Sequence, residues 1–427
     1  MNIAAYPQHE SYIDSGIDWI GEVPSTWSVE PGRQCLYESK EKNTGMKEST
    51  VLSLSYGRVI VKDEDKLTGL VPESFETYQV VQPGDIIIRG TDLQNDMTSL
   101  RTGLARNTGI ITSAYINLRP KADIDPKFLH YLLHSYDVKK VFYALGSGLR
   151  QNLSYEDFKY LRLPIPSPEE QRAIAAFLDG KCATIDEAVR IKEEQIRLLA
   201  ERRQILIQQA VTRGLNPAAP MKDSGIDWIG QIPAHWEAQR FKYLFEQSRL
   251  PVRPGDEVVT SFRDGQVTLR SNRRLEGFTE AIIEGGYQGI RVGQLVLNSM
   301  DAFEGAIGVS ESDGKCTPEY VICDPIQDGL SQQYFAYLLR EMALARYIQV
   351  ICNAVRQRAV RIRFNNLAHR FVVVPPADEQ KHIVEFVEAT KKRIGDAITL
   401  KETQITALRE YKTSLINAAV TGKIKVL

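Results

Sequence analysis

The sequence predicts a mixed α+β protein with a pseudo-two-fold internal repeat, in which two globular domains are joined by two long antiparallel coiled-coil helices. The segment 14–27 (DSGIDWIGEVPSTW) returns at 223–236 (DSGIDWIGQIPAHW), with ten of the fourteen residues identical at an offset of 209. Each half of the 427-residue chain also pairs a β-rich segment with a heptad-patterned helix. Two copies of one unit suit a target that itself has two halves.

The repeat extends through both halves of the chain. The run 84–89 matches 293–298 at the same offset, and 166–171 matches 375–380. Between these segments the offset slips to 205 and then returns to 209. The middles of the two units diverge while their ends do not, which indicates one common frame that carries two different recognition surfaces.

Each half has a globular part and a helical part. The globular parts mix short β-branched runs, such as Asp85–Ile88, with helical segments and with turns rich in Gly, Pro, Asn and Asp. The pattern therefore predicts α+β domains rather than all-α or all-β ones. The expected boundaries are 1–165 for the first globular domain, 166–215 for a central helical region, 216–375 for the second globular domain and 376–427 for a distal helical region.

The helix after the first domain begins at a capping box. The Ser167 hydroxyl can accept a hydrogen bond from the backbone N–H of Glu170. The second copy lacks this serine, so the same turn there must be held in another way.

Both helices carry heptads in which six of eight seam positions are apolar. These are Ile185, Val189, Ile196, Leu199, Leu206 and Ala210, matched by Ile394, Ile398, Ile405, Leu408, Leu415 and Ala419. Neither stripe can be buried alone, so the two helices are expected to pack on each other.

Basic residues occupy the two remaining seam positions of each helix. They are Lys192 and Arg203 in the first copy and Lys401 and Lys412 in the second. Antiparallel pairing would place Lys192 near Lys412. These side chains must then reach solvent, face a partner, or pair with acidic neighbours, for which the candidates are Glu193, Glu201, Glu402 and Glu410.

The composition is that of an ordinary globular protein, with 43% hydrophobic residues, 25% charged residues and a net charge of −1. No apolar run approaches the ~20 residues of a membrane span, and the first residues do not resemble a signal peptide. We expect a cytoplasmic protein with no membrane association. The five cysteines form no CxxC pair and are expected to be reduced packing thiols.

Sequence motifs for catalysis and metal binding are missing. There is no Walker A or Gly-x-Ser-x-Gly sequence, and 146–151 lacks the third glycine of a dinucleotide fingerprint. His130 and His134 are spaced like a helical zinc pair, but Tyr131 stands where the zinc-protease pattern needs Glu. We expect no metal, no catalytic residue and no enzymatic activity in this chain.

The chain resembles the specificity (S) subunits of type I restriction-modification systems. Three features carry the resemblance: the repeated GIDWIG-x-(V/I)-P-x-x-W, the strand end followed by Glu-Gln, and the long heptad helix after each domain. They occur twice, in the family's order, over nearly the whole chain.

The resemblance implies a non-catalytic subunit that recognises double-stranded DNA. Each globular domain would be a target-recognition domain for one half of a bipartite, asymmetric site. Two adenine methyltransferase (modification) subunits would dock on the helices, and a motor-nuclease (restriction) subunit would join them. The cofactors S-adenosylmethionine, ATP and Mg would then belong to those partners and not to this chain.

Candidate DNA-binding residues are the Arg, Asn, Gln and Thr side chains on loops after the repeated strands, because these side chains contact base edges and phosphates. The first domain contributes Arg89, Thr91, Gln94, Asn95, Arg101, Arg106, Arg150, Gln151 and Asn152. The second contributes Arg263, Arg270, Arg273, Arg274, Asn298, Arg356, Gln357, Arg358 and Arg361.

For each of these residues, a surface salt bridge, turn or cap is the alternative role. The aromatic residues that recur in both copies are expected to belong to the common frame instead. They are Trp19, Trp27, Tyr115, Trp228, Trp236 and Tyr320.

The helix length predicts the spacing of the two half-sites. A helix over 185–212 would be about 42 Å long at ~1.5 Å per residue, or about 12 base pairs at ~3.4 Å each. With half-sites of about 3–5 base pairs, the unread gap is roughly 6–9 base pairs. The competing hypothesis is a coiled-coil adaptor or scaffold protein with two ligand-binding heads and no nucleic-acid role.

Overall fold

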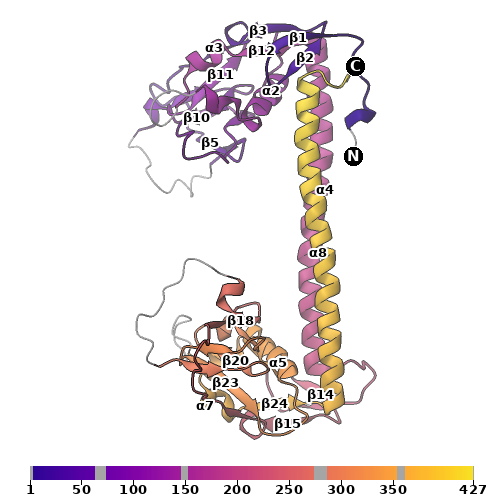
Figure 1. The fold of residues 1–427 in the computed structure, drawn as a ribbon. Helices are drawn as coiled ribbons and strands as arrows, with labels where there is room; N and C mark the ends of the chain where they lie inside the picture. Colours follow the sequence, from indigo (N-terminus) through magenta and orange to yellow (C-terminus); the bar gives the residue numbers. More distant parts are fainter. Residues whose placement is uncertain (1–2, 63–73, 146–151, 274–285, 353–360, 427) are drawn as a thin grey trace. The chain divides into compact units, whose positions relative to one another are not determined.

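The computed structural model describes residues 3–62, 74–145, 152–273, 286–352 and 361–426. The chain forms two compact units, of which the first comprises Met1–Glu193 with Glu402–Leu427 and the second comprises Glu194–Lys401. Two long helices, α4 (Pro168–Arg213) and α8 (Ala377–Val420), each contribute to both units. We call the globular part before α4 head 1 and the globular part between α4 and α8 head 2 (Figure 1).

Head 1 is built on a four-stranded antiparallel sheet with the order β4-β11-β8-β9. Its strands are β4 (Leu36–Glu38), β8 (Ile86–Ile88), β9 (Thr102–Leu104) and β11 (Ile116–Pro120). Four two-stranded ladders accompany it: β1 (Tyr12–Ile17) with β2 (Gly21–Pro24), β3 (Ser28–Pro31) with β12 (Arg162–Ile165), β5 (Leu52–Ser55) with β6 (Arg58–Val61), and β7 (Gln79–Val81) with β10 (Gly109–Ile111). The short α1 (Gly32–Cys35) and α3 (Tyr155–Lys159) and the longer α2 (Pro126–Val138) complete the head.

Head 2 repeats this topology element by element, with the sheet order β16-β23-β20-β21. The strands are β16 (Phe245–Gln247), β20 (Leu295–Asn298), β21 (Ile307–Val309) and β23 (Tyr320–Pro325). The matching ladders are β13 (Met221–Asp223) with β14 (Gln231–Pro233), β15 (Glu237–Arg240) with β24 (Phe371–Val374), β17 (Val259–Ser261) with β18 (Val267–Leu269), and β19 (Gln288–Ile290) with β22 (Gly314–Cys316). Helix α5 (Gln332–Leu344) takes the place of α2, followed by α6 (Tyr347–Ile351) and α7 (Phe364–Ala368). The predicted α+β repeat is confirmed.

Each unit has one main hydrophobic core, which the head and both helices share. In the first unit, Phe128 and Leu132 of α2 pack with Ile185 of α4 and Leu415 of α8. In the second unit the corresponding core includes residues of α5 together with Ile207 and Val211 of α4 and Ile383 and Val387 of α8. The heads are therefore anchored on the helices by apolar burial, the main stabilising term in folding.

The recurring aromatic residues pack in this frame, as predicted. Trp27 and Trp236 are buried in the main cores, and Trp19 and Trp228 pack against them. Tyr320 is likewise buried, and its hydroxyl accepts a hydrogen bond from the Ser261 N–H.

The seam of the helix pair matches the predicted heptads. All twelve apolar seam residues are buried or half-buried. In the first unit the pairing is antiparallel, because Asp186 contacts Lys412 while the later residue Lys192 contacts the earlier residue Gln404.

The structure describes partners for two of the basic seam residues, for which the sequence left several alternatives open. The Lys412 Nζ donates to both carboxylate oxygens of Asp186 at 2.7 and 2.8 Å, and the Lys192 Nζ donates to the Gln404 Oε1 at 2.7 Å. None of the four glutamates proposed from sequence is the partner of these two lysines. The seam lysines are held by polar residues on the opposite helix, which sequence spacing along one helix does not reveal.

A glutamine fixes the start of each long helix to its head. The Gln171 side chain donates to the Pro166 carbonyl at 2.9 Å and accepts from the Asp125 N–H at 2.8 Å. Gln380 makes the equivalent bonds to the Pro375 carbonyl and the Ser331 N–H, both at 2.9 Å. The predicted Ser167 cap on the Glu170 N–H is present at 3.3 Å. In the second copy, which lacks that serine, Gln380 holds the turn.

The histidines and cysteines behave as packing residues. Burial lowers the pKa of His130 to about 3 and that of His134 to about 4, so both rings are neutral near pH 7. All five cysteines are free thiols, and four of them are buried. Over the described ranges, no group of three or more His, Cys, Asp or Glu side chains is placed to hold a metal ion. No helix in the same ranges is long and apolar enough to span a membrane.

Candidate nucleic-acid interface

Two loops leave equivalent central strands of the two heads. Loop 1 (residues 89–100) follows β8, and loop 2 (residues 299–306) follows β20. The change of offset from 209 to 205 falls between these strands and the next pair, β9 and β21. The strands before the two loops keep the same offset of 209, so the change falls within the loops and makes them differ in length.

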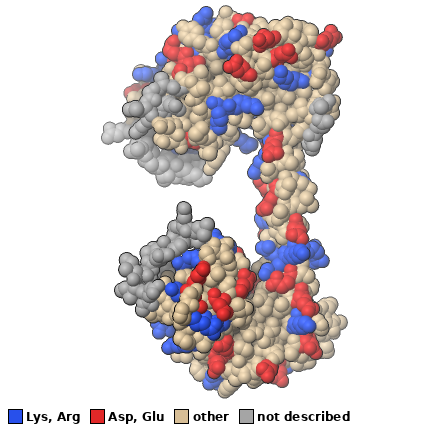
Figure 2. Space-filling view, viewed as in Figure 1, with Lys and Arg blue, Asp and Glu red and all other residues tan. Residues whose placement is uncertain are grey.

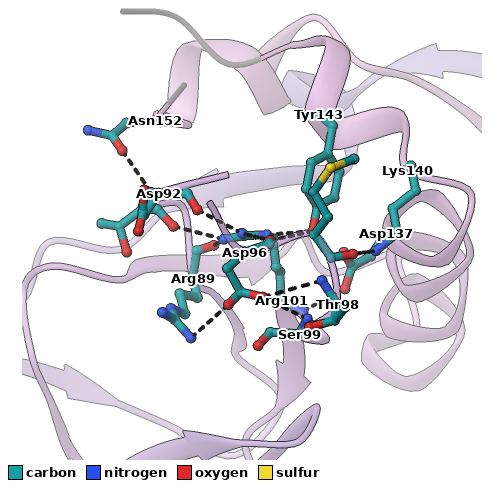
Figure 3. A network of polar contacts seen from close by, with 12 residues as sticks. Arg89, Asp92, Asp96, Thr98, Ser99, Arg101, Asp137, Lys140, Tyr143 and Asn152 are labelled. Carbon is teal, nitrogen blue, oxygen red and sulfur yellow. Dashed lines mark hydrogen bonds and ion pairs between the residues drawn. The ribbon is translucent and has the colours of Figure 1, made fainter. Parts of the chain in front are cut away.

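Arg101, the residue directly after loop 1, organises the loop backbone from inside (Figure 3). Its side chain is fully buried. The guanidinium donates to the carbonyl oxygens of Arg89 at 3.1 Å, Thr91 at 2.8 Å and Asp92 at 3.2 Å, and also to that of Asp96. A buried guanidinium needs such partners, because an unpaired buried charge is costly.

Other side chains of head 1 reinforce the same loop. The Tyr143 hydroxyl accepts from the Arg101 Nε at 3.1 Å and donates to the Asp96 carbonyl at 3.0 Å. The Lys140 ammonium lies 4.7 Å from the centre of the Tyr143 ring and donates to the Met97 carbonyl. Leu93 is fully buried and anchors the middle of the loop. Loop 1 therefore has a defined backbone although it lies at the surface.

The side chains that loop 1 exposes include two of the predicted DNA-binding residues, Gln94 and Asn95. The Asn95 amide donates to the Asp92 carboxylate at 2.8 Å and is otherwise solvent-facing. Thr91 is half-buried. Amide side chains of this kind can donate to and accept from adenine at once, which is the geometry of direct readout.

Arg89 is held at the edge of the loop by Asp96. Its guanidinium lies 3.3 Å from the Asp96 carboxylate. Hydrogen bonds from Ser99 lower the pKa of Asp96 to about 2, so this carboxylate stays charged near pH 7. Base or phosphate contact by Arg89 would have to displace that ion pair.

The prediction that Arg101 contacts DNA is wrong. The side chain has no exposed surface, and its donors are used by loop 1 carbonyls and by Tyr143. Sequence reasoning selected it because it is an arginine on a candidate loop. Only the packing shows that it points inward.

The remaining candidates of head 1 are partly described. Arg106 and Asn152 are exposed, and the Asn152 Oδ1 accepts from the Asp92 N–H at 2.9 Å, which joins residue 152 to loop 1. Arg150 and Gln151 lie outside the described residues.

The prediction that Asn298 of head 2 contacts DNA is also wrong. It is buried, its Oδ1 accepts from the Met300 N–H at 3.2 Å, and its Nδ2 donates to Asp301 at 3.3 Å. This asparagine therefore forms the turn into loop 2 and does not face outward, the turn role that Asn side chains commonly take.

The candidate arginines of head 2 that the structure describes make polar contacts. Arg263 forms ion pairs with Asp301, at 3.0 Å, and with Glu304. Arg273 lies 2.7 Å from Asp264 and stacks over the Phe262 ring at 4.2 Å.

Arg270 and Arg361 are the other two described candidates of head 2. Arg270 is half-buried, with its Nε 3.3 Å from the Thr260 hydroxyl, and the exposed Arg361 lies 3.8 Å from Glu319. The candidates Arg274, Arg356, Gln357 and Arg358 lie outside the described residues.

The surface charge is mixed rather than uniformly basic. On the face shown in Figure 2, Lys and Arg side chains alternate with Asp and Glu over both units. This agrees with the net charge of −1 and with the ion-paired arginines. Any nucleic-acid interface must therefore depend on local groups of basic residues.

One such group was missed from the sequence. A cavity of about 840 Å³ in the first unit lies between head 1 and the helix pair. Five basic residues line it: Arg58, Arg106, Lys127, Arg409 and Lys412. The acidic lining residues are Asp179 and Asp186, so basic side chains are in excess. The basic residues come from distant parts of the chain, and only Arg106 stood on a candidate loop.

The fold and the loops define a class of protein. The chain has two α+β heads of one topology, each carrying a differently built polar loop on the same strand, and both heads share one pair of long helices. This is the organisation of a duplicated recognition scaffold.

Comparison with known proteins shows which family this chain resembles. Residues 82–197 match the family described as the type I restriction modification DNA specificity domain. A protein of Methanocaldococcus jannaschii provisionally named the type I restriction enzyme MjaX specificity subunit is 21% identical, over 95% of this chain and 96% of its own length.

Two solved structures share the fold. A chain from a structure concerning complex assembly and conformational transition of the type I R-M system matches with a TM-score of 0.67 and 15% identity, over 94% of this chain and 99% of its own length. The HsdS subunit from Thermoanaerobacter tengcongensis matches with a TM-score of 0.55 and 16% identity, over 94% and 98%. Residues 82–197 thus match a type I restriction modification DNA specificity domain, and nearly the whole chain is similar to a specificity subunit of a type I restriction enzyme.

Proposed function

We propose that this chain selects the DNA sequence for a type I restriction-modification complex by recognising a bipartite, asymmetric site, with one half-site for each head. The observation that carries the proposal is the pair of equivalent loops. One frame, repeated strand for strand, presents loop 1 and loop 2 from β8 and β20, and the loops differ in length and side chains. Equal frames with unequal loops suit two different half-sites.

In head 1 the contact to bases would come from the exposed amides of loop 1. Gln94 and Asn95 are exposed on a loop whose backbone is held by Arg101 and Tyr143. In head 2, Arg263 and Arg273 are described candidates that are paired with carboxylates, and these partners would be replaced by DNA phosphates or guanine edges. The basic cavity of the first unit supplies further groups for phosphate contact.

The helices would carry the partner subunits. Ile191, Leu198 and Ile205 of α4 are 44%, 49% and 51% exposed at a spacing of seven residues, and Leu400 of α8 is 56% exposed. A heptad-spaced apolar stripe outside the seam is the surface that a further helix would cover. We assign it to docking of two modification subunits, which a restriction subunit would join. S-adenosylmethionine, ATP and Mg would be bound by these partners.

The decisive experiment is methylome sequencing of a host that expresses this chain with its modification subunits. The expected result is adenine methylation at a two-part motif whose gap is roughly 6–9 base pairs at ~3.4 Å per base pair. A host that expresses the modification subunits without this chain is the control. Methylation that is absent, or unchanged when the chain is omitted, would contradict the proposal.

A binding assay separates the proposal from a protein-binding adaptor. The purified complex should shift duplexes containing the motif, and the affinity should fall steeply between about 50 and 200 mM salt because counterions are released from DNA. A complex that binds no DNA, or binds it without salt dependence, would favour the adaptor.

A further inference from the structure

We propose that Arg101 is the positioning residue for one half-site: from inside head 1 it holds the backbone of loop 1 in the conformation that presents Gln94 and Asn95 to DNA. The inference rests on the proposed function and deepens it. Arg101 does not touch DNA in this proposal, because it has no exposed surface. Its effect on specificity is transmitted through the loop.

The first observation is how Arg101 is bonded. Its side chain reaches four carbonyl oxygens spread over residues 89–96, and its own N–H donates to Asp137 at 2.6 Å. A guanidinium presents five donors in a fixed planar fork, whereas an ammonium is a compact charge with three. Lysine at this position would therefore leave loop carbonyls without a donor. The geometry is specific to arginine.

The second observation is the conformation that these bonds maintain. Asp92 has a φ of 57°, in the left-handed region that non-glycine residues seldom adopt. The Arg101 Nη atoms donate to the carbonyls of the two peptide groups that flank Asp92, those of Thr91 and Asp92, and Asn152 accepts from the Asp92 N–H. This strained residue lies two and three positions before Gln94 and Asn95. Releasing it would reorient both side chains.

The third observation is that the exposed face of loop 1 has few contacts of its own. Gln94, Asn95, Met97 and Thr98 are exposed, whereas Leu93 and the loop carbonyls are turned inward. Recognition groups on a loop discriminate well when their supporting residues fix them before binding. Arg101 and Tyr143 supply this support, as the bonds drawn in Figure 3 show.

The test uses the complex of the full chain with its modification subunits. Its substrates are duplexes that carry the native motif and every single-base change in either half. Initial methylation rates give the discrimination at each position. The variants are Arg101→Lys and the milder Tyr143→Phe. The control is Arg119→Lys, because Arg119 is also a poorly exposed arginine of head 1 but pairs with Asp85 in the frame, at 2.7 Å.

We expect Arg101→Lys to lower discrimination at one half-site by about tenfold or more, which is the discrimination that one good base contact supplies. The other half-site, recognised by head 2, should keep its discrimination within about twofold and so reports that the complex is folded. Tyr143→Phe should act in the same direction but less strongly, and Arg119→Lys should change neither half.

Unchanged discrimination at both half-sites in Arg101→Lys, or an equal loss at both, would overturn the inference. If the Arg101→Lys chain does not assemble with the modification subunits, the same comparison of the two half-sites is made with Tyr143→Phe. A wild-type complex that shows no two-part motif is a different result, because it contradicts the proposed function itself.

Discussion

At the scale of single residues, the second copies of the two repeated motifs contact each other. In the second unit the Trp236 indole N–H donates to the Glu379 carboxylate at 2.8 Å, and His235 contacts the same carboxylate. Trp236 closes the GIDWIG motif, and Glu379 belongs to the Glu-Gln pair at the start of α8. In the second unit the two motifs therefore meet where head 2 joins the start of α8.

The buried glutamine at the start of each long helix should contribute measurably to the free energy of unfolding. Gln380→Ala would leave the Ser331 N–H and the Pro375 carbonyl without a partner, and Gln380 is buried. Buried groups left unsatisfied cost about 1–3 kcal/mol. Urea denaturation should show a loss of this size, whereas the exposed Gln209→Ala should show almost none. Equal midpoints for the two variants would contradict the role.

The buried carboxyl of Glu341 should make the stability of the second unit depend on pH. Burial raises the pKa of this carboxyl from its ordinary 4.5 to about 7, while the hydrogen bond from Gln204 opposes the shift. Because the folded pKa is raised, the stability is fully present below about pH 4.5. It is lost as the pH rises toward about 7, since the unfolded chain releases the proton first.

The corresponding experiment compares Glu341→Gln with the wild type across that window. The unfolding free energy of the variant relative to that of the wild type should increase by about 2–3 kcal/mol from pH 5 to pH 8, at 1.36 kcal/mol per pKa unit. Denaturant unfolding at several pH values measures the difference, in which other titrating groups cancel. A difference that is constant with pH, or that grows toward acid, would contradict the assignment.

At the scale of elements, the helix pair separates seam residues from exposed ones. Leu415 is fully buried, whereas Leu198 is 49% exposed on α4. Leu415→Ala should cost about 2–5 kcal/mol. Leu198→Ala should leave the stability of the isolated chain within about 0.5 kcal/mol but weaken its association with the modification subunits. Thermal unfolding and a pull-down with those subunits test both parts, and similar unfolding temperatures for the two variants would be inconsistent with the seam.

The helices and the loops differ in how far the sequence predicts them. The seam was predictable because a helix has one period, so spacing alone states which residues share a face. Loop 1 has no period. Its conformation depends on Arg101, Tyr143 and Asn152, which lie after the loop in the chain and meet it only in the fold.

At the scale of the whole molecule, the two units have separate main cores although they share both long helices. Leu338 is fully buried in the core of the second unit. Leu338→Ala should cost about 2–5 kcal/mol and raise amide hydrogen exchange within Glu194–Lys401. The amides of head 1 should keep their protection. Uniform loss of protection throughout the chain would show that the units unfold as one.

Much of the organisation followed from the amino-acid sequence alone. The offset of 209 predicted the duplicated topology, and the heptads predicted the buried faces of α4 and α8. Repeats and periodic patterns are properties of neighbours along the chain, so they can be seen without coordinates. The recurring tryptophans could be assigned to the frame for the same reason.

The direction of individual polar side chains was decided only by the tertiary structure. Arg101 and Asn298 are buried, Lys412 and Lys192 bond to Asp186 and Gln404 of the opposite helix, and a cavity is lined by basic residues from distant segments. The residue type alone does not distinguish an arginine that supports a loop from one that faces DNA. Burial and the placement of its partners decide between these roles, and both depend on contacts between residues far apart in sequence.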